Sequence, residues 1–194
     1  MSPAEDDEVA GSLEGIIDFL RAAERLKTVR RSGWTSEGER ESVAEHTWRL
    51  SLLAMVLYGG DPTVDLGRLL RICVIHDLGE AIRGDIPAPE QLGAKAADER
   101  LDLLALVEPL PLRMREEIVS LWDDYESGGS REARLAKGLD KLETILQHAQ
   151  GHNPPGFDYR FNLDYGRAHT AADPLLAALR ARLDVLTARR AEEG

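Results

Sequence analysis

Two histidines and two aspartates are the residues of this chain whose types and order could do metal chemistry. His46 is followed by the adjacent pair His76-Asp77 and, farther along, by Asp140. Imidazole nitrogen and carboxylate oxygen together suit a borderline divalent transition metal such as manganese, cobalt, iron or zinc. Four such ligands would leave coordination positions open for water and substrate, as in a catalytic site. The pattern therefore indicates metal-assisted hydrolysis.

His46 lies in the first turn of a helix that the sequence predicts to begin at Ser42. Ser42-Val43-Ala44-Glu45 has the form of a capping box, a serine followed three residues later by a glutamate. Leucines follow His46 at four, seven and eleven residues, so His46 continues the apolar face of this helix. An inward histidine needs partners for both ring nitrogens. A core histidine bound to a backbone carbonyl is the structural alternative to a metal ligand.

His76-Asp77 follows an apolar run near the end of a helix predicted over about residues 65–81. Adjacent helical residues differ by about 100° in direction, so both side chains can flank one point. A buried aspartate without a cation would be costly, which favours a metal ligand over a cap or a salt bridge. Asp140 lies within a helix predicted to extend to about residue 150, and an ion pair with Lys137 or Lys141 is its alternative.

The elements that must position these residues are all predicted to be helices, with no strand. Residues 1–11 read as a disordered acidic leader, and residues 12–194 as one compact domain. A long connection over residues 151–170, rich in glycine, proline and asparagine, precedes a last helix capped at Asp173-Pro174. Helices are also predicted over about residues 13–28, from residue 42, over about residues 65–81 and over about residues 89–107. The next helix is predicted to end at about residue 126, and the one after it at about residue 150.

Composition limits the partners. The net charge is −11, so a polyanion such as DNA would be repelled and polymeric nucleic acid is excluded as a partner. The single cysteine, Cys73, lies in an apolar run and is predicted to be a buried structural residue. The N-terminus lacks the apolar region of a signal peptide, and no apolar stretch approaches the ~20 residues that span a bilayer. A cytoplasmic protein without membrane contact is expected.

Four blocks of the sequence together resemble a known family. FLRAAERLKTVRRSGW, ESVAEH, VIHDLGEAIRGDIP and GLDKLETIL occur in this order between about residues 19 and 147. They are similar to the HD-domain metal-dependent phosphohydrolases, in particular to the subgroup that includes the 5′-deoxynucleotidases. The resemblance implies an all-α HD-domain bundle that binds one divalent metal through His46, His76, Asp77 and Asp140. Because the family commonly forms dimers, a homodimer is also expected.

The same resemblance implies roles beyond the metal. An arginine of the basic turn, matched by Arg31, would bind the substrate phosphate, with Trp34 close to the substrate. Arg30 stands where related sequences often have a proline, so either arginine could be the one that reaches the phosphate. Glu80 would position water at the phosphorus as a catalytic residue, and Asp85 would contact the sugar.

Elementary chemistry agrees with these roles. A divalent cation with Asp77 and Asp140 sums to zero formal charge, so a phosphate dianion needs a separate cation. A guanidinium can bind phosphate through two parallel hydrogen bonds. Glu80 follows Asp77 by three residues and therefore lies beside the ligand pair, where it could orient or deprotonate water.

The leading hypothesis is a phosphomonoesterase acting on nucleoside 5′-monophosphates, in particular the deoxy forms. The alternatives are a related hydrolase of another nucleotide phosphate or pyrophosphate bond, and a non-catalytic nucleotide-binding protein. No histidine lies between Asp77 and Asp140, which argues against a dinuclear oxygenase or phosphodiesterase. His148 and His152 have the spacing of a helical metal pair, but the helix is predicted to end between them. The sequence does not fix the metal or the base.

Overall fold

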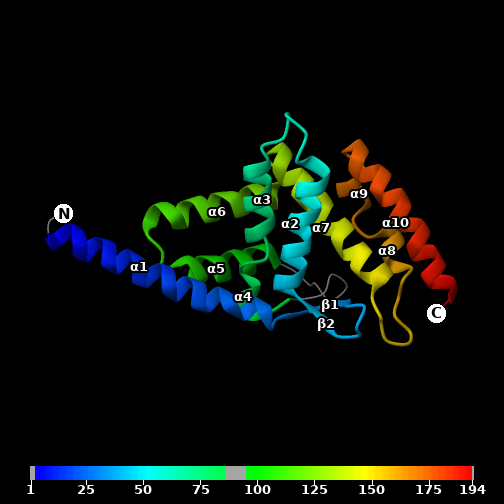
Figure 1. Cartoon of the computed structure of the whole chain (residues 1–194), viewed down its shortest axis with the longest axis horizontal. Helices are drawn as coiled ribbons and strands as arrows, with labels where there is room; N and C mark the ends of the chain where they lie inside the picture. The colour runs from blue at the N-terminus through cyan, green and yellow to red at the C-terminus, as the bar shows by residue number, and fades with distance from the viewer. Residues whose placement is uncertain (1–2, 86–94, 194) are drawn as a thin grey trace.

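The computed structural model describes the backbone of residues 3–85 and 95–193, and it is helical almost throughout (Figure 1). The predicted all-α class is confirmed. None of the described helices is long and apolar enough to cross a membrane. The helices are α1 (Pro3–Ala23), the 3₁₀ helix η1 (Glu24–Lys27), α2 (Val43–Tyr58), α3 (Leu66–Ile75), α4 (Glu80–Arg83), α5 (Lys95–Val107), α6 (Leu112–Ser127), α7 (Arg131–Gln150), α8 (Phe161–Asp164), α9 (Arg167–Thr170) and α10 (Pro174–Glu193).

Helix α7 forms the centre of the fold and packs against α2, α3, α6, α9 and α10. Most of its residues are buried, with Leu139, Leu142 and Ile145 fully so. Gly138 allows close approach of α10, because a Cβ there would lie 2.5 Å from Leu176 Cδ1. Because neighbouring elements surround α7 on most sides, its polar residues Asp140 and Glu143 are also buried in the interior.

A small antiparallel hairpin precedes α2, where no strand was predicted. It pairs β1 (Arg30–Trp34) with β2 (Arg40–Ser42), and Thr35 N donates to Glu39 O at 2.7 Å across the turn. The prediction was wrong here because β1 has no alternation of apolar and polar residues. Packing on α7 stabilises the hairpin instead: a Cβ at Gly33 would lie 2.9 Å from Gln147 Cγ.

The helix predicted over residues 65–81 is interrupted. Helix α3 ends at Ile75, residues 76–79 form turns, and α4 begins at Glu80. Leu78, Glu80 and Ala81 each donate a backbone hydrogen bond three residues back, as in a 3₁₀ helix. The tighter winding aligns residues three apart. Asp77 and Glu80 are therefore brought one above the other.

Other boundaries also differ from those expected. Helix α1 begins at Pro3, inside the segment expected to be a disordered leader, and a proline followed by acidic residues is a favourable helix start. Of the helix predicted over residues 89–107, α5 starts at Lys95, and residues 86–94 lie outside the described residues. The expected connection over residues 151–170 contains the short helices α8 and α9.

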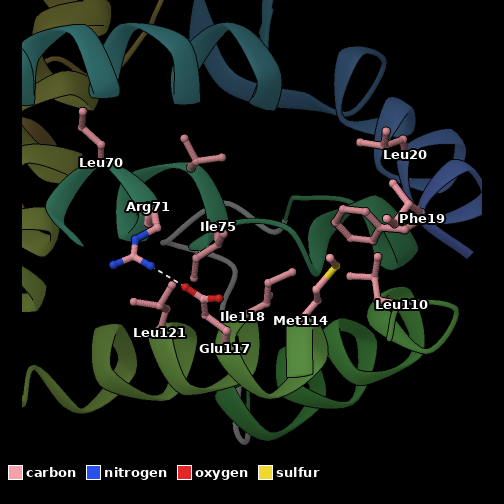
Figure 2. Close-up of a pocket in the computed structure, with 12 residues that line it drawn as sticks. Phe19, Leu20, Leu70, Arg71, Ile75, Leu110, Met114, Glu117, Ile118 and Leu121 are labelled. Carbon is pink, nitrogen blue, oxygen red and sulfur yellow. Dashed lines mark hydrogen bonds and ion pairs between the residues drawn. The ribbon is translucent and has the colours of Figure 1, made fainter. Parts of the chain in front are cut away.

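An apolar groove of about 590 Å³ lies between α1, α3 and α6 (Figure 2). Phe19 and Leu20 line it from α1, and an ion pair between Arg71 and Glu117 joins α3 to α6 within it. The groove is lined by carbon over most of its surface and contains none of the predicted site residues. It is therefore separate from the candidate metal centre.

The predicted capping box at the start of α2 is confirmed and gives a stability prediction. Ser42 Oγ accepts a hydrogen bond from Glu45 N at 3.2 Å, and Ser42 N donates to Glu45 Oε2 at 2.6 Å. Ser42→Ala removes the cap of a helix that carries His46, and we expect the free energy of unfolding to fall by about 1 kcal/mol. Urea denaturation measures the loss, with Ser36→Ala in the exposed hairpin turn as control. Equal stability of the two variants would contradict the expectation.

Candidate metal centre

The structure brings together the four residues predicted to bind a metal. His46 comes from α2, Asp140 from α7, and His76-Asp77 from the residues that follow α3. His46 Nε2 lies 3.3 Å from Asp140 Oδ1 and 3.9 Å from Asp77 Oδ2. His76 Nε2 lies 3.1 Å from Asp77 Oδ2 and 4.0 Å from Asp140 Oδ1. Two nitrogens and two oxygens thus face one another across the space that an ion would occupy.

The hydrogen bonds of the two histidines indicate how each ring is oriented. His46 Nδ1 donates to Glu143 Oε2, and His76 Nδ1 donates to the backbone oxygen of Cys73 at 2.8 Å. Both Nε2 atoms are buried and, in the part of the chain that the structure describes, have no hydrogen-bond partner. Two lone pairs aimed at carboxylates are stable only with a cation between them, so the residues fit a divalent metal ion.

The electrostatics favour a positive charge at this point. Burial and Arg31 oppose a proton on His46, yet the carboxylates of Glu143 and Asp140 raise the pKa of His46 to about 9. Burial would raise the pKa of Asp140, but Lys141 and His46 hold it well below its usual range. The carboxylates therefore stay ionised and attract a cation.

Each oxygen of Asp140 has its own surroundings. Oδ1 faces the two histidines, while Oδ2 accepts hydrogen bonds from Tyr125 Oη at 3.1 Å and from Lys141 Nζ at 2.8 Å. Lys141, considered as a surface partner from the sequence, is partly buried and forms an ion pair with Asp140. With Oδ2 held by two donors, Oδ1 remains available to a single ion.

Sequence reasoning missed Glu143 and Arg49. Glu143 is fully buried between His46 and Arg49, whose Nε donates to Glu143 Oε1 at 2.6 Å. A carboxylate bound to the far nitrogen of a ligand histidine fixes the ring and raises its basicity. Glu143 follows Asp140 by three residues and so shares its helical face. That spacing was the available signal.

Arg31, and not Arg30, lies beside these residues. Arg31 Nη1 donates to Asp77 Oδ2 at 3.2 Å, and Nη2 donates to Thr144 Oγ1 at 3.1 Å. The Arg30 side chain is 47% exposed, and its guanidinium donates to the backbone oxygen of Arg40. Arg31 is therefore the one of the two arginines that lies adjacent to the candidate metal ligands, and its contact with phosphate stays a prediction.

The remaining predicted residues lie at different distances from the centre. Glu80 is buried and its backbone nitrogen donates to Asp77 O at 3.1 Å. Burial opposes charge on Arg31, but Asp77, Asp140 and Asp85 raise the pKa of Arg31, so Asp85 faces the same region. Trp34 is placed by its backbone oxygen, which accepts a hydrogen bond from Gln147 Nε2 near the end of α7. Contact of the Trp34 ring with substrate stays a prediction.

The two histidines of the second pair do not lie on one helix. Helix α7 ends at Gln150, between His148 and His152, as predicted. His148 is buried and its Nδ1 pairs with Asn162 Oδ1 at 3.0 Å, whereas His152 is exposed.

Comparison with known proteins places this geometry in a family. The sequence profile of the family described as HD domain matches residues 23–180. The 5′-deoxynucleotidase HDDC2 of Mus musculus is 34% identical over 154 residues, covering 76% of each chain. The 5′-deoxynucleotidase hdd1 of Schizosaccharomyces pombe is 38% identical over 141 residues, covering 68% of this chain and 70% of its own.

A solved structure has the same fold over nearly the whole chain. The crystal structure of a predicted metal-dependent phosphohydrolase from Magnetospirillum magnetotacticum MS-1 superposes with a TM-score of 0.80 and 29% identity. The match covers 93% of this chain and 95% of the other.

The geometry predicts that a divalent ion binds only when both histidines are present. His76→Ala removes one of two Nε2 donors, and we expect the purified variant to lose most of its bound metal. Elemental analysis after dialysis against Mn²⁺ measures metal per chain, with His152→Ala in an exposed loop as the matched control. Full metal occupancy in His76→Ala would refute the ligand assignment.

Proposed function

The chain belongs to the HD-domain family, and we propose that it is a metal-dependent phosphomonoesterase that hydrolyses deoxynucleoside 5′-monophosphates to nucleoside and phosphate. One observation carries the proposal: two buried Nε2 atoms face two carboxylates, with the Arg31 guanidinium 3.2 Å from one of them. A bound metal ion and the permanently charged Arg31 guanidinium would then lie side by side, and two adjacent positive charges suit a phosphate group. The names of the mouse and fission yeast relatives, both 5′-deoxynucleotidases, support the substrate class.

His46, His76, Asp77 and Asp140 would hold the divalent metal, whose identity stays open. When bound, such an ion acidifies a coordinated water and polarises a phosphoryl oxygen. The protein must still supply the positive charge that its two carboxylates cancel. Arg31 is placed to do so, since its position next to Asp77 lets the guanidinium bind phosphate oxygens through two hydrogen bonds.

Glu80 is proposed to orient the attacking water and to accept its proton. Its backbone position directly after the turn that holds Asp77 puts it beside the ligand pair, and it is buried. A carboxylate in such surroundings can act as a general base when water lies within hydrogen-bond distance. Asp85 is proposed to accept a hydrogen bond from the 3′-hydroxyl of the sugar.

A homodimer and a cytoplasmic location stay predictions. Apolar side chains that α1 and α2 leave exposed support a second copy as partner; among them are Leu13, Leu20, Trp48 and Met55. Scattered apolar residues are normal on a surface, but two adjoining helices that expose several are typical of an interface.

The role of Glu80 gives a prediction that separates catalysis from metal binding. Glu80→Gln keeps the size of the side chain but cannot accept a proton, so we expect kcat to fall about 10²–10⁴-fold with metal content unchanged. Phosphate release and elemental analysis measure the two quantities. Glu108→Gln, an exposed residue at the end of α5, is the control. Loss of metal together with activity would make Glu80 a ligand and not a base.

The substrate assignment is tested by phosphate release from a panel of nucleotides after single metals are restored to the stripped protein. We expect kcat/KM for dAMP to exceed that for AMP. Removing the 3′-hydroxyl, as in 3′-deoxy-AMP, should cost about ten- to a hundredfold, because a hydrogen bond to a charged acceptor contributes ~1.5–3 kcal/mol. Equal values for the three would show that Asp85 does not contact the sugar. Release of pyrophosphate from deoxynucleoside triphosphates, with no phosphate released from the monophosphates, would favour the related hydrolases.

A further inference from the structure

Glu41 is a buried carboxylate that the proposed mechanism does not use. It lies in β2 with 3% of its surface exposed. Its Oε2 is 3.6 Å from Arg31 Nε, and its Oε1 is 4.0 Å from Arg49 Nη2. Burial and the charge of Glu143 together raise the pKa of Glu41 to about 7. Burying this carboxylate costs folding free energy, so a functional role for Glu41 is worth considering.

The three nitrogens of the Arg31 guanidinium each face a different partner. Nε faces Glu41, Nη1 donates to Asp77 at 3.2 Å, and Nη2 donates to Thr144 at 3.1 Å. A guanidinium is planar, so partners on three sides fix both the position and the plane of the group. Glu41 approaches the guanidinium from the side of Nε, and Asp77, one of the candidate metal ligands, approaches it from the side of Nη1.

The hairpin makes this contact available. Arg31 and Gly33 both belong to β1, and both lie close to the Glu41 carboxylate. A Cβ at Gly33 would lie 3.4 Å from Glu41 Oε2 and 2.9 Å from Gln147 Cγ. A glycine here lets β1, the Glu41 carboxylate and α7 approach one another closely.

Arg49 holds the other side of the Glu41 carboxylate. It pairs with Glu143 at 2.6 Å and lies within ion-pair distance of Glu41. Charges therefore alternate from Arg31 through Glu41, Arg49 and Glu143 to His46. Glu41 is fixed between two cations and can in turn fix the Arg31 guanidinium.

We propose that Glu41 is a positioning residue that holds the Arg31 guanidinium in the orientation that binds the phosphate of the substrate. A long, flexible side chain loses conformational entropy when it binds a ligand, and an arginine already held by the fold loses less. Glu41 touches no substrate in this scheme and acts only through Arg31. The inference rests on the proposed function in one respect, that the ligand of Arg31 is a phosphate group.

The test measures binding of inorganic phosphate to the Mn²⁺-loaded full chain by calorimetry. Glu41→Gln keeps the volume and removes the charge, and we expect phosphate affinity to fall between about tenfold and a hundredfold. KM for dAMP should rise more than kcat falls. Metal content should match the unsubstituted protein. Glu39→Gln, an exposed glutamate of the same hairpin, is the matched control and should bind phosphate normally.

A double-mutant cycle with Arg31→Met isolates the positioning role. If Glu41 acts through Arg31, then Glu41→Gln causes no further loss of phosphate affinity once Arg31 is replaced. An equal loss in both backgrounds, or unchanged affinity in Glu41→Gln alone, overturns the proposal. Should Glu41→Gln fail to fold, Glu41→Asp serves in its place: it keeps the charge one methylene farther away and should give a smaller loss that also vanishes with Arg31→Met.

The outcome for the function is separate. A chain whose Arg31 binds phosphate in a way that depends on Glu41, yet that hydrolyses none of the nucleotides, would contradict the proposed activity and leave the positioning role intact. A metal-loaded chain that hydrolyses nucleotides, but whose Glu41→Gln variant binds phosphate normally, would support the proposed activity and contradict the positioning role.

Discussion

The convergence of two buried imidazole Nε2 atoms and two carboxylates in the protein interior is the constraint on which the rest of this structure depends. Such a group is unstable without a cation, so every element around it either supplies a ligand or fixes one. Helix α7 does both, because one face carries Asp140 toward the centre and carries Glu143 to the back of His46. Its packing by neighbours on several sides keeps that face buried.

The charges around the centre are arranged in pairs and not left to solvent. Asp77 contacts Arg31, Asp140 contacts Lys141, and Glu143 contacts Arg49, all at 3.2 Å or less. Buried ion pairs seldom add to stability, since the loss of hydration offsets the attraction between the charges. The fold therefore accepts a local cost here. What it gains is a set of candidate ligands and an adjacent guanidinium that are already held in place by the fold.

Much of this site could be predicted from the sequence. The residues that could not be predicted have one property in common. The four candidate ligands stand in or directly after sequence segments with helical apolar periodicity, and the capping box at Ser42 marks the helix of His46. Local patterns suffice for such residues. Glu143 and Arg49 are 94 residues apart in the chain, and their pairing depends on how α2 and α7 pack. No local pattern reports such a contact, so ordinary helix charges and buried ones look alike in sequence.

The choice between Arg30 and Arg31 shows what the unpredicted hairpin adds. In an irregular turn, two adjacent arginines are equivalent candidates, and the sequence left both open. Gly33 lets β1 approach α7 closely, and the Arg31 side chain contacts Asp77, one of the candidate metal ligands, and Thr144 of α7. Arg30 then points away, toward Glu45 on the outer side of α2. A five-residue strand thus places one of the two adjacent arginines beside the candidate metal ligands and leaves the other exposed.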